Sequence, residues 1–151
     1  MLFRSVEIET MLSTSDNRTF VVLTDGDVKK IVELNTYEST MLPFALRGLH
    51  LNSHIQTIHQ LFFKFLKTFK TEIENIFIES KVGDIIYTSI KFKDSNHNRT
   101  FSITSLCDGL ILSLISNKQL YAVASVWEEL DEQDDWDYEE YLADFPDDID
   151  D

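Results

Sequence analysis

The sequence predicts an α+β domain, in which a mostly antiparallel or mixed sheet of hairpins carries about three helices. Two kinds of periodicity indicate this fold class. Several segments alternate apolar and polar residues, which is typical of strands with one wet face, whereas others repeat apolar residues at helical spacing. The order of these segments places helices between groups of hairpins. A chain of 151 residues is long enough to enclose a substantial core as one domain.

Seven segments are predicted as strands. Asp25-Gly26 separates the second from the third and favours a tight hairpin, because glycine tolerates the positive φ that such turns need. A second hairpin is expected around residues 81–83, where a glycine again interrupts the alternation. The predicted strands cover residues 3–11, 18–24, 28–35, 74–80, 84–94, 99–104 and 119–125.

Three segments are predicted as helices. Residues 36–49 form the weakest, because Pro43 removes a backbone donor and should kink or restart the helix. Another helix begins after Ser105 and is apolar almost throughout. The tetrapeptide Asn-Arg-Thr-Phe begins at both Asn17 and Asn98, each time entering a strand, which leaves open an internal duplication or a chance repeat.

The clearest helix is predicted over residues 56–69. Its apolar residues recur at helical spacing, and we expect this phenylalanine face to be buried on the sheet. Lys64, Lys67 and Lys70 fall on the opposite side and are candidates for contact with nucleic-acid phosphates, although such a stripe is also typical of a solvated helix face. The apolar stripe consists of Ile58, Leu61, Phe62, Phe65, Leu66 and Phe69.

The net charge of −14 is concentrated at the C-terminal end. Residues 128–151 contain 14 of the 27 acids and no Lys or Arg, which leaves 13 acids against 13 basic residues in the rest of the chain. We therefore predict two parts, an α+β domain over 1–127 and an acidic tail over 128–151. The domain itself is neutral, so its charge does not exclude a DNA or RNA ligand.

The acidic tail contains an aromatic stripe. Tyr138, Tyr141, Leu142 and Phe145 follow i, i+3, i+4, i+7 spacing, and Pro146 ends the pattern. Acidic tails are usually disordered and solubilising. The stripe supports a second interpretation, in which the tail docks on its own domain or on a protein partner and keeps nucleic acid away.

The remaining composition predicts a soluble, cytoplasmic protein. The N-terminus lacks the pattern of a signal peptide, and no apolar stretch approaches the ~20 residues that cross a bilayer. Cys107 is the single cysteine, which fits a reducing compartment and a buried helix position. Homo-oligomerisation is a further expectation, because a small domain with apolar helices and strand edges can expose surfaces that pair.

Asp108 is the one acid in the apolar run from Thr104 to Ile115. If Ser105 is the N-cap, Asp108 is the N3 residue and can close a capping box with the Ser105 amide. The alternative is a functional carboxylate, because an acid beside apolar neighbours is partly desolvated. The sequence leaves both interpretations open, with the capping box favoured.

Three segments of the chain form one ordered pattern. "TIHQL" places His59 at the start of a helix, "TSLCDGLILSL" places Asp108 at the opening of an apolar helix, and "QLYAVAS" follows as a strand. With these segments, residues 30–94 and 104–130 resemble the bifunctional nuclease family, first described as a domain of unknown function. The resemblance aligns His59 and Asp108 with the family's histidine and acid, whereas Ser105 and Leu106 stand where the family has Arg-Pro.

The resemblance implies hydrolysis of DNA or RNA with the help of a divalent metal, Mg²⁺ or Mn²⁺. Asp108 would then be a metal ligand, and His59 a base or a phosphate contact. The metal and its full set of ligands are not identified by the sequence. The alternative is a non-catalytic module that binds protein or nucleic acid and is regulated by its acidic tail.

Overall fold

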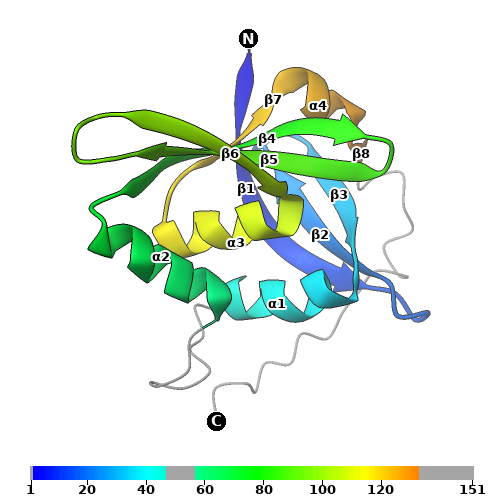
Figure 1. The fold of residues 1–151 in the computed structure, drawn as a ribbon. Coiled ribbons are helices and arrows are strands. Elements are labelled where there is room, and N and C mark those ends of the chain that lie inside the picture. Colours follow the sequence, from blue (N-terminus) through cyan, green and yellow to red (C-terminus); the bar gives the residue numbers. More distant parts are fainter. Residues whose placement is uncertain (1, 47–56, 133–151) are drawn as a thin grey trace.

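The computed structural model describes residues 2–46 and 57–132 (Figure 1). Within these residues the chain forms eight strands and four helices, which confirms the predicted α+β class. The elements are β1 Phe3–Ser13, β2 Thr19–Thr24, β3 Lys29–Leu34, α1 Thr36–Leu46, α2 Ile58–Thr68, β4 Glu72–Val82, β5 Ile85–Lys93, β6 Arg99–Ser105, α3 Leu106–Ser116, β7 Leu120–Val123, α4 Ala124–Glu129 and β8 Asp131–Glu132.

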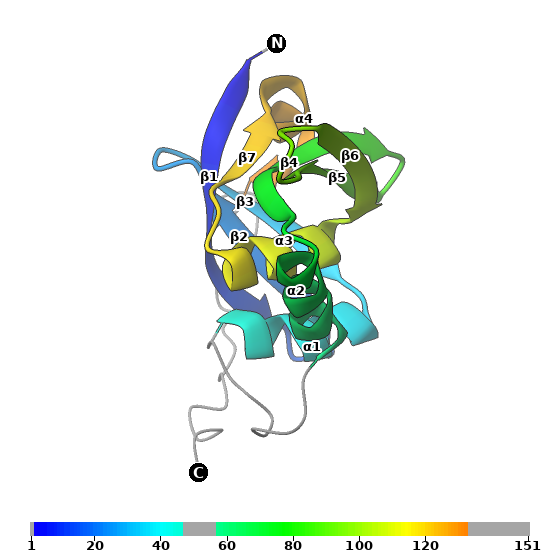
Figure 2. The ribbon, with the colours of Figure 1, turned by 60° about the vertical axis from the view of Figure 1, so that its left-hand side comes forward.

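The strands form one open, mixed sheet with the order β6-β5-β4-β7-β1-β2-β3-β8. Only the β4–β7 pair is parallel among the described strands, because α3 carries the chain from β6 back to the middle of the sheet. The long strand β1 joins the two halves, since Phe3–Val6 pairs with β7 and Glu7–Ser13 pairs with β2. Figure 2 shows how strongly the sheet bends along this strand.

Both predicted hairpins are confirmed. Strands β2 and β3 are antiparallel, and the Asp25 carboxylate closes their turn by accepting hydrogen bonds from the amides of Asp27 and Val28 at 2.9 and 2.8 Å. Gly26 has a φ of 98°, which explains the glycine at this position. Strands β4 and β5 form the second hairpin, with Gly83 at a φ of 62°.

Helix α3 lies at the centre of the fold. It packs on β4, β5 and β6 and is flanked by α1 and α2 on the same side of the sheet (Figure 1). Seven of its residues are buried, and these contribute much of the main core cluster together with the inward side chains of the strands. A helix that is apolar on all sides is expected in such a place. No helix of the described ranges is long and apolar enough to span a membrane.

Helix α2 is confirmed, but the face predicted to be buried is wrong. Phe65 is 58% exposed and Phe69 is 62% exposed, and the rest of the predicted stripe except Leu66 is exposed as well. The face that packs inward is formed by His59, Phe63 and Leu66, and the main contact of α2 is with α3. Helix α3 covers the centre of the sheet, so Phe65 and Phe69 stay exposed, while Phe62 reaches only the edge of the Phe92 ring in β5, at a centroid distance of 6.2 Å.

The fold continues beyond Trp127. Helix α4 buries Trp127, and β8 then pairs with β3 and leaves Leu130 buried. The Lys30 ammonium, only 4% exposed as a residue, donates to the Leu130 carbonyl at 3.0 Å and lies 3.5 Å from the Glu132 carboxylate. These first residues of the acidic segment therefore complete the sheet, whereas the aromatic stripe at 138–145 lies outside the described residues.

The repeated tetrapeptide enters two turns of the same kind. Residues 14–18 and residues 94–98 each close a turn with two matching backbone hydrogen bonds. The first turn joins β1 to β2, whereas the second joins β5 to β6, so it follows the second strand of its own three-strand unit. The repeat therefore marks similar turns and does not mark equivalent places in the two halves.

Candidate functional site

Thr57 starts α2 and sets the position of His59. The Thr57 hydroxyl accepts a hydrogen bond from the Gln60 amide at 3.1 Å, and the Gln60 side chain accepts one from the Thr57 amide at 2.9 Å. This reciprocal capping box satisfies two amides that a helix start leaves unpaired. It fixes the first turn, in which His59 faces α3 while Ile58 faces solvent.

Ser105 starts α3 as the sequence predicts, because its hydroxyl accepts a hydrogen bond from the Asp108 amide at 3.1 Å. The Asp108 carboxylate, however, does not bind the Ser105 amide as a capping box would require, and contacts His59 instead. Its Oδ1 lies 2.7 Å from Nε2 of His59, and its Oδ2 lies 3.5 Å from the Thr104 hydroxyl. Asp108 therefore joins α3 to α2, and the structure brings together the two residues predicted as a catalytic pair.

The His59 ring is enclosed between the two helices, with only 6% of the side chain exposed. A carboxylate oxygen accepts, so Nε2 is the donor to Asp108. The other nitrogen, Nδ1, is buried and has no hydrogen-bond partner among the described residues. A general base must reach the proton that it removes, and neither nitrogen of His59 faces solvent in this arrangement. The geometry favours a positioning role, in which His59 holds α2 against α3.

Asp108 remains the more accessible member of the pair, with 36% of its side chain exposed. It can touch a ligand at the start of α3 through Oδ2. The described ranges 2–46 and 57–132 contain no group of three His, Cys, Asp or Glu residues arranged to hold a metal ion. Asp108 is therefore the one predicted ligand for Mg²⁺ or Mn²⁺ that is partly exposed, and the described residues do not complete a set of three ligands around it.

Cys107 lies in the core beside Asp108, with 1% exposure. Burial raises the pKa of its thiol to about 12, and the nearby carboxylates of Glu38 and Asp108 act in the same direction. A thiol with such a pKa stays protonated and unreactive at neutral pH. The expectation of a buried structural cysteine is therefore confirmed.

The outer side of α2 carries both aromatic and basic side chains. At 100° per residue, the exposed positions form one continuous arc that runs from the phenylalanines through Leu61 and Lys64 to Lys67. Lys67 lies over the ring of Phe63, with Nζ 4.6 Å from the ring centroid. Phe65 and Phe69 contact each other at a centroid distance of 4.6 Å. The helix itself contains no acidic residue.

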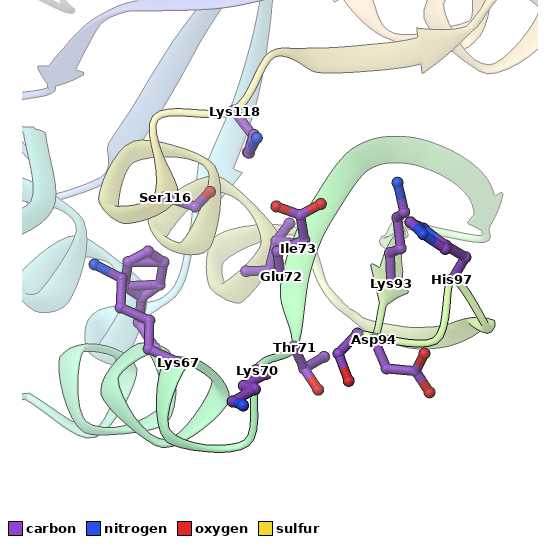
Figure 3. Close-up of a pocket in the computed structure, with 12 residues that line it drawn as sticks. Lys67, Lys70, Thr71, Glu72, Ile73, Lys93, Asp94, His97, Ser116 and Lys118 are labelled. Atoms are coloured by element: carbon purple, nitrogen blue, oxygen red, sulfur yellow. The ribbon is translucent and has the colours of Figure 1, made fainter.

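A hollow of about 530 Å³ lies beside the C-terminal end of α2 (Figure 3). Its walls come from α2, the start of β4, the β5–β6 turn and the end of α3. We call it the lysine hollow after its four lysines, Lys67, Lys70, Lys93 and Lys118. Two of the three lysines predicted from the sequence line it, whereas Lys64 lies farther along α2.

The cations of the lysine hollow differ from those elsewhere in the described chain. In residues 2–46 and 57–132, its four lysines form no ion pair with a carboxylate, and neither do Lys64 and Lys81. All the other described lysines and arginines have a carboxylate within 3.5 Å. These paired cations are Arg4, Arg18, Lys29, Lys30, Lys91 and Arg99.

Sequence reasoning missed Lys93 and Lys118. They stand 26 or more positions from Lys67 and enter the hollow only because β5 pairs with β4 and α3 ends beside α2. The sequence offered a local pattern for Lys93, since it is the last residue of β5, where lysines alternate with inward-facing residues. It offered none for Lys118, because a lysine after a helix end is an ordinary surface residue.

No protein-family model matches this sequence, and no curated protein matches it. The site must therefore be interpreted from its own geometry.

Proposed function

We propose that this protein is a non-catalytic module that binds single-stranded nucleic acid, and that α2 is its contact surface. The observation that carries the proposal is the exposed arc of α2, where phenylalanines share one helix with lysines that form no ion pair among the described residues. Proteins that bind single strands combine aromatic platforms for the bases with cations for the phosphates. Phe62, Phe65 and Phe69 supply the platform, and Lys64, Lys67 and Lys70 supply the cations.

The His59–Asp108 contact supports a binding role for this surface. It fixes the first turn of α2 against the buried helix α3 at an N–O distance of 2.7 Å. A platform held rigid before the ligand arrives loses less conformational entropy on binding. In this proposal His59 and Asp108 position the surface. The motif resemblance to bifunctional nucleases is in line with nucleic acid as the ligand, although the proposal rests on the exposed arc of α2.

The direct test is the anisotropy of a fluorescent single-stranded oligonucleotide titrated with the full-length protein. Phe65→Ala should weaken binding by about 1–3 kcal/mol, the usual contribution of one stacked base. Phe101→Ala is the matched control, because Phe101 is similarly exposed at 63% but projects beside Lys91 on the outer face of the sheet. Equal losses for the two variants would refute the assignment of α2 as the contact surface.

The second candidate is metal-dependent hydrolysis, which the family resemblance implies. The partial exposure of the Asp108 carboxylate is the observation in its favour. It predicts that Mg²⁺ or Mn²⁺ allows the purified protein to cleave a labelled single strand and that Asp108→Ala abolishes cleavage. Binding without cleavage by both proteins supports the non-catalytic module.

The acidic tail is proposed to regulate this surface. Its carboxylates are close enough through the chain to compete with phosphates, and their field extends over roughly a Debye length, ~8 Å at physiological salt. Because α4 and β8 belong to the domain, the informative truncation ends at Glu132. It should raise affinity for a single strand at low salt. Equal affinity of the truncated and full-length proteins at several salt concentrations would reject regulation by the tail.

A protein partner or a second copy of the chain is the competing occupant of α2. Its exposed phenylalanines are also suited to self-association, as the sequence already suggests. Sedimentation of the full-length protein with and without oligonucleotide distinguishes these occupants. A dimer that persists at low micromolar concentration and is broken by Phe65→Ala would replace the nucleic-acid proposal.

A further inference from the structure

The lysine hollow has the size and composition of a ligand site. Its volume of about 530 Å³ falls within the range of roughly 300–1,000 Å³ that is common for small-molecule sites. Phe63 and Ile73 give it an apolar wall, and the lysines stand around that wall with His97 at the β5–β6 turn (Figure 3). Such a combination suits a ligand with one anionic end and one flat or apolar part.

The charges of the hollow favour an anion. Four lysines face two acids, Glu72 and Asp94. The Asp94 carboxylate is turned to its own loop, where it accepts hydrogen bonds from the amides of Asn96 and Asn98 at 2.9 Å each. These bonds hold the pKa of Asp94 below its usual value, with the Asn98 amide contributing most. Asp94 therefore stays ionised, and because its carboxylate is engaged by its own loop, Glu72 is the carboxylate free to face the lysines. Four lysines against these two acids leave the hollow with a net positive charge.

Two residues of the hollow adopt backbone conformations that favour glycine. Lys70 has a φ of 53° and His97 a φ of 64°. Lys70 follows the C-cap of α2, where the amides of Lys70 and Thr71 donate to the carbonyls of Lys67 and Leu66 at 3.1 and 2.9 Å. This is the Schellman arrangement, in which glycine is the usual residue. A lysine that occupies such a position gives up local stability and places its charge beside the hollow.

We propose that the lysine hollow holds the terminal phosphate monoester of a single-stranded nucleic acid together with its last nucleotide. This inference rests on the proposed function, since the rest of the strand would continue along α2. Lys93 and Lys118 contact the phosphate oxygens from two different parts of the fold, Lys67 lies on the side where the nucleic-acid strand continues along α2, and Phe63 and Ile73 lie against the sugar or base.

A strand end fits this site better than an internal phosphate does. A terminal monoester carries close to two negative charges at neutral pH, whereas an internal diester carries one, so four clustered lysines discriminate between them. The hollow is also concave, and a concave site accepts an end more readily than a continuous backbone. The Glu72 carboxylate makes a weakly charged anion a poor ligand, because only a strong anion outweighs it.

The experiment compares three oligonucleotides of one sequence, carrying a 5′-phosphate, a 3′-phosphate or no terminal phosphate. Each is titrated into the full-length protein, and binding is followed by anisotropy at fixed salt. We expect one phosphorylated end to bind about tenfold tighter than the unphosphorylated strand, which is the advantage of one additional charged contact. Equal affinity for all three strands would overturn the proposal.

Three variants test whether the preference arises in the hollow. Lys93→Gln and Lys118→Gln should abolish the preference for the phosphorylated end while the unphosphorylated strand still binds. Lys81→Gln is the matched control, because Lys81 also lacks an ion pair among the described residues but lies on the far part of β4, at another surface. It should keep the full preference. A preference that survives both hollow variants would place the phosphate elsewhere.

Glu72→Gln should change affinity in the opposite direction from the lysine variants. Removing the opposing carboxylate should strengthen binding of the phosphorylated strand by several-fold, since the four lysines then act without it. Unchanged or weaker binding by this variant would contradict the electrostatic argument.

A free nucleotide shares the chemistry of the strand end, so adenosine monophosphate and adenosine are titrated separately. Nucleotide binding that needs Lys93, combined with no binding of any strand, would refute the function proposed for α2 and would assign the hollow to a free nucleotide instead. Strand binding without any effect of a terminal phosphate would refute only the end recognition and would leave α2 as the contact surface.

Discussion

Helices α2 and α3 differ in what surrounds them, although both contain 11 residues and both begin at a hydroxyl N-cap. Seven residues of α3 are buried, whereas α2 buries only His59. Helix α3 is apolar over most of its surface and packs on the sheet, while α2 concentrates its apolar residues on a stripe that faces solvent. The comparison shows that amphipathic spacing identifies an apolar face but does not identify what covers it.

The contrast has a physical reason. A sheet face accepts one layer of helix, and α3 fills the centre of that layer because its sequence tolerates burial all round. Helix α2 packs on the side of α3 through His59, Phe63 and Leu66, a contact too narrow to cover Phe65 and Phe69 as well. An apolar stripe that the described residues leave mostly exposed is available to a ligand.

The largest expected effect is on α3, at Gly109. A Cβ at this position would lie 2.2 Å from Oγ1 of Thr88 and 2.7 Å from its Cβ, so the helix could not keep its distance from β5. Thr88 is fully buried and donates to the Ser105 carbonyl at 3.0 Å, which prevents it from moving aside. Gly109→Ala should lower the free energy of unfolding by about 3 kcal/mol, as overpacking does. Urea denaturation measures the loss, and an unchanged midpoint would show that the two elements are farther apart.

Removing the His59–Asp108 contact between α2 and α3 should lower the free energy of unfolding by an intermediate amount. Asp108→Ala removes the acceptor from an enclosed imidazole and should cost about 1–3 kcal/mol of stability. Asp108→Asn should cost less, because the amide oxygen still accepts from Nε2 of His59. A double-mutant cycle with His59→Ala measures the coupling, and strictly additive losses would mean that the contact contributes nothing.

The pH dependence of the unfolding free energy tests whether Cys107 of α3 is buried. Its folded pKa of about 12 lies above the unfolded value of 9.0, so protonation favours the folded state. This contribution is complete below pH 9 and is lost as the pH rises from 9 toward 12, by at most ~1.4 kcal/mol per pH unit. Unfolding free energies at pH 8 and pH 10 should therefore differ more for the natural protein than for Cys107→Ala. Identical pH dependence in the two proteins would show that the thiol is not buried.

Lys70→Gly should act on stability and binding in opposite directions. Glycine relieves the positive φ after α2 and should stabilise the protein by ~1 kcal/mol. The same change removes a cation from the lysine hollow and should weaken binding of a single strand. Unfolding and anisotropy measurements on one preparation provide both results. A gain in stability without loss of affinity would show that Lys70 does not contact the nucleic acid.

Local features of the fold could be predicted from the sequence. The Asp25-Gly26 turn, the Ser105 N-cap and the existence of α2 depend on neighbouring residues, and all three are confirmed, although α2 spans Ile58–Thr68 where 56–69 was predicted. The orientation of α2 and the end of the domain could not be predicted in the same way. The orientation of α2 depends on α3 covering the sheet, and the end of the domain depends on the pairing of β8 with β3, about 100 positions away in the chain.

The candidate site was predictable only in part, for the same reason. His59, Asp108, Lys67 and Lys70 stand in segments with a recognisable pattern, so they could be selected singly. Which of these residues lie together could not be predicted, because the His59–Asp108 contact spans 49 positions and the lining of the lysine hollow comes from four separate parts of the fold. The capping-box interpretation of Asp108 was half correct, since the helix is capped by Ser105 while the carboxylate binds His59.

The most direct test of the central claim, that α2 presents a binding face, is the unfolding free energy of Phe65→Ala measured beside its affinity for a single strand. A core phenylalanine loses about 3–5 kcal/mol on truncation to alanine. Phe65 is 58% exposed, so we predict a loss below about 0.5 kcal/mol, typical of a surface position, together with clearly weaker binding. A loss of 3 kcal/mol or more with unchanged affinity would contradict the account, because it would place the stripe of α2 in the core.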